Sequence, residues 1–145
     1  MYRLFRLAAA FATVVVLVAL PRSSQAQITE NIVASISHSF IVNNTALPPG
    51  KYTFHMIQQT GEAVMRVSSA DGRIATDFLV RDSINDHLPQ HTELVFNRYG
   101  GKEFLARIYE SGTKIGASVV NVSREEASLK NQGQTGTTHT EEQTR

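Results

Sequence analysis

The sequence predicts an all-β protein: a single antiparallel β-sandwich, or partly open barrel, of about seven or eight strands, with a short C-terminal helix and a disordered tail. Two features of the chain lead to this expectation. Apolar and polar residues alternate in several short segments, whereas no apolar segment beyond residue 26 keeps the 3.6-residue period of a helix. Turn-forming residues also recur about every ten residues, a spacing typical of antiparallel sandwiches and barrels.

Four strands are expected in the first half of this region. They cover 32–42, 51–57, 63–67 and 74–80. The segments 43–45 (Asn-Asn-Thr) and 47–50 (Leu-Pro-Pro-Gly) separate the first two strands, because these residues favour turns. Asp71-Gly72 predicts a hairpin between the last two, since glycine readily adopts the positive φ of a tight turn.

Three more strands and one helix are expected in the second half. The strands cover 93–98, 104–109 and 115–122, and the run 99–102 (Tyr-Gly-Gly-Lys) joins the first two as a hairpin. The run 123–126 (Ser-Arg-Glu-Glu) matches a capping box, which predicts a short helix near Arg124–Lys130. No large apolar residue follows Asn131. We therefore expect a folded domain over 27–130 and a disordered polar tail over 131–145.

The N-terminal segment has the pattern of a cleavable secretory signal. Arg3 and Arg6 precede an uninterrupted apolar run over 7–20, and Pro21 then stops any helix. Small residues place the expected cleavage between Ala26 and Gln27. A membrane span needs about 20 apolar residues, and this run has 14. The expectation is a protein that is secreted or periplasmic after cleavage, with no stable membrane anchor.

Charge and cysteine content narrow the functional classes. Cleavage after residue 26 removes three cations and leaves 11 Lys and Arg against 13 Asp and Glu. A weakly acidic chain without a basic run is not expected to bind nucleic acid. The chain has no cysteine, so neither disulfides nor lipid attachment at a cysteine can occur.

Several short motifs resemble an uncharacterised family of exported bacterial proteins. The similar residues are Leu47–Tyr52, the turn at Ser69–Arg73, and Leu94–Gly100 followed by Phe104-Leu105 and Ile108. In that family LPxGxY and LVFxRYG…FL recur in the same order, and the resemblance covers about residues 30–126. This chain departs from it at Pro49, where alanine is usual, and at Tyr109, where tryptophan is common. The resemblance implies a secreted β-sandwich-like fold, and it implies no activity.

The densest group of possible metal ligands lies in the polar segment between two predicted strands. Asp82, Asp86, His87 and His91 fall within ten residues, and imidazoles and carboxylates are ligands for Zn²⁺ and other divalent ions. Their spacing is not a known signature, and Pro89 prevents a regular helix from aligning the two histidines. An ordinary polar surface loop is the alternative interpretation.

No sequence pattern indicates catalysis, so no catalytic residue and no cofactor are expected. The hypothesis is a non-catalytic binding or structural module of the envelope or extracellular space, whose ligand or protein partner is unknown. Tyr99, at a predicted hairpin tip, is the aromatic residue expected to be exposed for ligand binding. Self-association through an edge strand, for which 32–42 is the candidate, is a further possibility. The alternative function is a metal-dependent or hydrolytic secreted enzyme using the Asp82–His91 loop.

Overall fold

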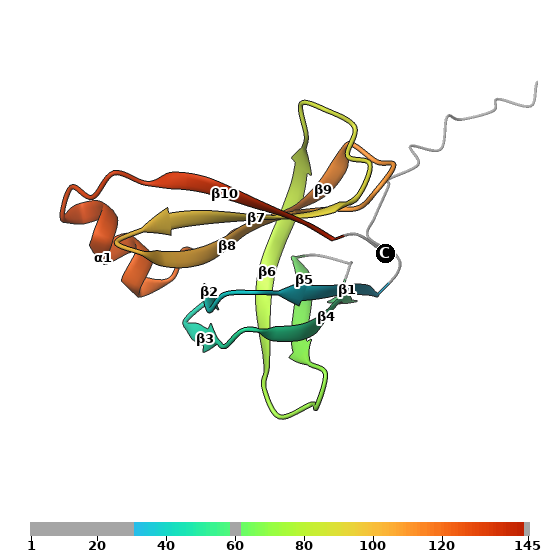
Figure 1. The fold of residues 1–145 in the computed structure, drawn as a ribbon, viewed down its shortest axis with the longest axis horizontal. Coiled ribbons are helices and arrows are strands. Elements are labelled where there is room, and N and C mark those ends of the chain that lie inside the picture. Colours follow the sequence, from blue (N-terminus) through green and yellow to red (C-terminus); the bar gives the residue numbers. More distant parts are fainter. Residues whose placement is uncertain (1–30, 59–61, 144–145) are drawn as a thin grey trace, which may run out of the picture.

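The computed structural model describes residues 31–58 and 62–143, and these residues form ten strands and one helix (Figure 1). The predicted all-β class with a short C-terminal helix is therefore confirmed. The predicted signal segment and its cleavage site at Ala26 and Gln27 lie outside the described residues. Within the described residues, no helix is long and apolar enough to cross a membrane.

The strands are bounded as follows. They are β1 (Ile32–Ile36), β2 (Phe40–Val42), β3 (Thr45–Leu47), β4 (Gly50–Gln58), β5 (Ala63–Ser69), β6 (Ala75–Ile84), β7 (Thr92–Tyr99), β8 (Lys102–Tyr109), β9 (Ile115–Val119) and β10 (Thr137–Gln143). The helix α1 covers Arg124–Asn131. The hydrogen-bonded order is β1-β4-β5-β6-β9-β8-β2-β3, with β7 on β8 and β10 on β7.

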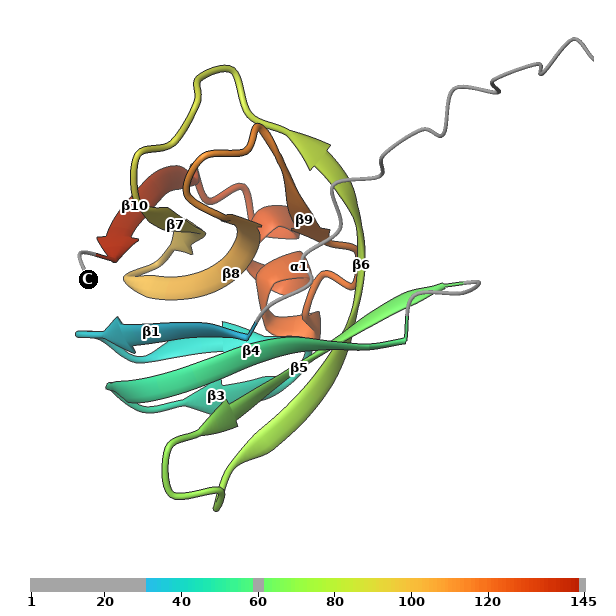
Figure 2. The same cartoon turned by 90° about the vertical axis from the view of Figure 1, so that its right-hand side faces the viewer.

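This order curls the sheet back toward itself without closing it. β1 and β2 follow each other in the chain, but β1 pairs with β4 whereas β2 pairs with β8, in parallel at Glu103 and Phe104. Figure 2 shows the result as two layers, one with β1, β4 and β5 and the other with β7, β8 and β10, joined by the long curved strand β6. The strand expected over 32–42 is therefore two strands, because its halves pair with opposite layers.

The core lies between these layers. It contains the inward-facing residues of both layers, which are Ile32, Ala34, Ile36, Phe40, Val42, Leu47, Tyr52, Phe54, Met65, Val67, Phe78, Val80, Leu94, Phe96, Leu105, Ile108 and Ala117. Phe40 makes edge-to-face contacts across the core, with ring centroids 5.2 Å from Tyr52 and 5.7 Å from Phe96. Burial raises the pKa of Tyr52, whose hydroxyl donates to the carbonyl oxygen of Pro48 at 2.5 Å.

Local signals in the sequence account for the ends of several elements. Gly100 and Gly101 both have positive φ (56° and 76°), as a tight turn between β7 and β8 requires. Ser123 caps α1, since its hydroxyl accepts from the main-chain nitrogen of Glu126 at 3.1 Å. The predicted hairpin is thus present, and so is the serine N-cap of the predicted capping box.

The C-terminal segment differs from the expected disordered tail. Residues 137–143 form β10, which pairs antiparallel with β7 along the whole strand. Main-chain groups at the edge of β7 can bond any extended segment, whatever its side chains. The lack of large apolar residues after Asn131 therefore did not prevent a strand from forming there.

Candidate metal centre

β10 approaches β1 and the connection between β1 and β2 at residues 37–39, and we call this line the β1–β10 seam. The amide of Ser35 donates to the side-chain oxygen of Gln143 at 2.7 Å. The amide and hydroxyl of Ser37 both donate to Glu141, at 3.3 Å. Side chains of β10 thus bridge the gap that the curled sheet leaves open.

His38 enters the seam from the β1–β2 connection. Ser37 and His38 lie in a bend between two strands that pair with different layers. The imidazole stands edge-on to the ring of Phe96, with centroids 4.8 Å apart, and its side chain is 22% exposed. The fully buried Phe96 forms the floor beneath it.

Glu103 enters the same region from β8. It lies opposite Arg98 of β7 in register and two residues before the core residue Leu105, so its side chain points to the inner face. Its Oε1 accepts from Nε of Arg98 at 2.6 Å and also contacts Nη2 of the same guanidinium. The side chain is only 5% exposed, so this carboxylate is buried with one paired oxygen.

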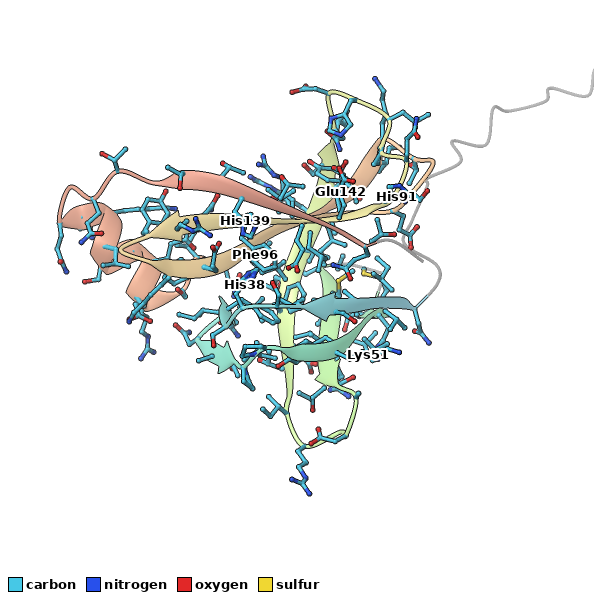
Figure 3. All side chains as sticks on the ribbon, in the orientation of Figure 1. His38, Lys51, His91, Phe96, His139 and Glu142 are labelled. Carbon is cyan, nitrogen blue, oxygen red and sulfur yellow. The ribbon has the colours of Figure 1, made fainter. Side chains whose placement is uncertain are left out.

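His139 is supplied by β10. It lies opposite Phe96 in register, and Glu141 lies opposite Leu94, so both side chains share the inner face with core residues. The rings of His38 and His139 have centroids 5.1 Å apart (Figure 3). Nδ1 of His139 is 3.3 Å from Oε1 of Glu103, which is an ion-pair distance without the geometry of a hydrogen bond.

The polar atoms without partners concentrate at this point. Among the described residues, five buried side-chain nitrogen or oxygen atoms have no hydrogen-bond partner. Four of them belong to the seam: His38 Nε2, Glu103 Oε2, His139 Nδ1 and Glu141 Oε2. Such an atom costs about 1–3 kcal/mol when it is left unpaired in the interior. Grouping four of these atoms is costly unless another species binds there.

His38, Glu103 and His139 form the group that could hold a metal ion among the described residues. One ligand atom from each lies within 4.8 Å of the other two. Zinc bonds of about 2.0–2.2 Å in a tetrahedron place ligand atoms about 3.4 Å apart. Binding therefore requires the ligand atoms to move closer by up to about 1.4 Å.

Glu141 lies beside His38, in the place where a carboxylate could support a metal-bound histidine. Its Oε2 lies 3.7 Å from Nδ1 of His38, on the ring nitrogen opposite the unpartnered Nε2. Metal-bound histidines usually donate their second N–H to a carboxylate, which fixes the tautomer and the ring orientation. At 3.7 Å the two atoms form no hydrogen bond, but a small approach would let Nδ1–H of His38 donate to Glu141 and leave Nε2 for an ion.

The residues proposed as ligands from sequence lie elsewhere and do not join this group. Asp82 belongs to β6 and is exposed opposite Ala117, because β6 extends into the expected loop. His87 pairs through Nε2 with Oε1 of Glu93 at 2.8 Å. The main-chain carbonyl of Asp86 accepts from the side chain of a lysine on the neighbouring loop.

His91 lines a cleft of about 950 Å³ together with Lys51, Ser35 and Gln143. Figure 3 places His91 and Lys51 toward the end of the molecule away from His38 and His139. The cleft is therefore separate from the metal-ligand group, although both lie along the β1–β10 seam.

Tyr99 occupies the predicted hairpin tip, but its ring is half-buried. The amine of Lys130 lies 5.2 Å from the ring centroid, and Gly136 is close enough that an added Cβ would lie 2.3 Å from the ring. The segment that follows α1 covers the aromatic face. Part of the ring is therefore covered, and the expected role of Tyr99 in ligand binding stays a prediction.

Comparisons of the chain with protein-family models, with curated proteins and with solved structures gave no match. Sequence reasoning missed His38, Glu103 and His139. The available signal was the alternation of His139, Glu141 and Gln143, which places three long polar side chains on one face of an extended segment.

Proposed function

We propose that this protein is an exported module that binds one divalent transition-metal ion of the zinc type through His38, Glu103 and His139. Two observations carry the proposal: one ligand atom from each of the three side chains lies within 4.8 Å of the other two, and each side chain also holds a buried atom without a hydrogen-bond partner. A metal ion satisfies these atoms together, and a single hydrogen bond between any two of them does not. Export rests on the N-terminal signal pattern alone.

The donor set favours a particular class of ion. Two imidazole nitrogens and one carboxylate oxygen suit Zn²⁺ and neighbouring transition metals, whereas Ca²⁺ takes six to eight oxygen ligands. The paired Oε1 of Glu103 stays with Arg98, so the unpartnered Oε2 is the oxygen available to the ion. A bound cation would also offset the buried negative charge of Glu103, because Arg98 contacts only one of its two carboxylate oxygens.

A hydrolytic enzyme is the second candidate. Catalytic zinc sites keep three protein ligands and leave one position for water or substrate. The side chain of His139 is 35% exposed although its Nδ1 is buried, so this ring is the part of the group that meets solvent. A panel of ester, peptide and phosphate substrates with the zinc-loaded protein tests this role. Turnover that disappears in Glu103→Gln supports an enzyme, and no turnover leaves metal binding as the function.

Isothermal titration with zinc chloride tests metal binding directly. Protein expressed from the full sequence and purified without metal is expected to bind one equivalent. His38→Ala and His139→Ala are each expected to weaken binding by more than the roughly 10–100-fold that an outer-shell change costs. Circular dichroism spectra that match wild type show that both variants keep their fold.

His87→Ala and His91→Ala are the matched controls, because they remove imidazoles that the structure places away from the group. Both are expected to bind zinc as wild type does. Loss of binding in these two variants, together with retention in His38→Ala and His139→Ala, would move the site to the Asp82–His91 loop. Absence of any saturable zinc binding by wild type would overturn the proposed function.

A further inference from the structure

β10 differs from the other strands of its layer in having no apolar anchor. Its sequence is Thr-Thr-His-Thr-Glu-Glu-Gln, and no residue of it is buried as a whole, although single polar atoms of His139 and Glu141 are. The neighbouring strand β7 buries four consecutive residues over 93–96. Burial of apolar area normally holds a strand in place, so β10 must depend on other contacts.

The contacts of β10 are main-chain pairing with β7 and polar contacts across the seam. Gln143 and Glu141 accept hydrogen bonds from Ser35 and Ser37, and His139 faces Glu103. Water competes for every one of these hydrogen bonds, and strands held mainly in this way open at low free-energy cost. The unpartnered atoms of His139 and Glu141 add to this tendency, because separation of β10 exposes them to water.

The three metal ligands lie on three different segments. His38 is in the β1–β2 connection, Glu103 is in β8, and His139 is in β10. An ion bound to all three ties the C-terminal strand to both layers of the sheet, at a place where the protein alone supplies only weak contacts. The same ion removes the cost of the unpartnered atoms.

Building on the proposed function, we propose that the metal ion acts as a latch for β10. With the ion bound, β10 is docked on β7 and the seam is closed. With the ion released, β10 separates and uncovers the edge of β7 and the ring of Phe96. Binding and docking reinforce each other, because a ligand that binds only the docked state shifts the population toward it.

Hydrogen–deuterium exchange of the full chain, with and without zinc, tests the latch. At a free zinc concentration about 100 times Kd, exchange of the β10 amides is expected to slow by up to about 100-fold. The β5–β6 hairpin pairs with β4 and β9 rather than with the strands of the seam, and it serves as an internal reference whose exchange is expected to change little. In His139→Ala, β10 is expected to exchange rapidly whether or not zinc is present, while the reference hairpin shows that the fold persists.

Glu142→Ala is the matched control on the same strand, because Glu142 is exposed on the outer face between two inward-facing residues. It is expected to keep the zinc-dependent protection. Zinc that binds wild type without changing the exchange of β10 would overturn the latch and leave the proposed function standing. No zinc binding at all would overturn both.

Discussion

Zinc is expected to raise the melting temperature of the wild-type protein by about 12 °C when its free concentration is about 100 times Kd. Binding to the folded state alone contributes about 2.7 kcal/mol at this concentration. The structure describes 110 residues, and an unfolding entropy of about 2.1 cal/mol/K per residue gives about 0.23 kcal/mol/K. Dividing the binding free energy of about 2.7 kcal/mol by the unfolding entropy of about 0.23 kcal/mol/K gives the expected shift of about 12 °C.

Thermal unfolding followed by circular dichroism measures this shift. Excess chelator is expected to return the melting temperature to the metal-free value. His38→Ala and His139→Ala are expected to show no zinc-dependent shift, whereas His91→Ala is expected to behave as wild type does. A shift that survives in both ligand variants would show that the stabilising ion binds at another place.

Three further changes probe the support of the site and the fold. Glu141→Gln weakens the acceptor beside His38 and is expected to lower zinc affinity by about 10–100-fold in titration. Gly116→Ala is expected to destabilise the protein by about 1–3 kcal/mol in urea, since an added Cβ would lie 2.2 Å from a backbone oxygen of β8. The hydrogen bond from Arg66 lowers the pKa of Asp77. This pair therefore stabilises the fold above the unfolded-state value of about 3.9 and loses its contribution as the pH falls through the lower folded-state value. Asp77→Asn is expected to show a smaller loss of melting temperature than wild type between neutral and strongly acid pH.

The fold could be predicted where the signal is local. Alternation over 51–57 and 63–67 identified β4 and β5, and the glycine pair at 100–101 identified a hairpin that the backbone angles confirm. Each of these features depends on residues within one strand or one turn. Features that depend on distant pairing were harder to predict from the sequence. The division of 32–42 into two strands is one of them, because each half pairs with a different distant strand.

The candidate site could not be predicted in the same way. Its ligands are separated by 65 and 36 residues in the chain, and they meet only because the sheet curls and β10 pairs with β7. One ligand, His139, lies in a segment whose composition favoured disorder. The Asp82–His91 loop shows the converse, since its ligand-type residues are near in sequence and the structure directs them to different partners.

Anomalous X-ray diffraction from crystals of the zinc-loaded protein, recorded on both sides of the zinc absorption edge, shows where the ion binds. The prediction is a single strong peak about 2.0–2.2 Å from Nε2 of His38, Oε2 of Glu103 and Nδ1 of His139. A strong peak at the Asp82–His91 loop, with none in the β1–β10 seam, would contradict it.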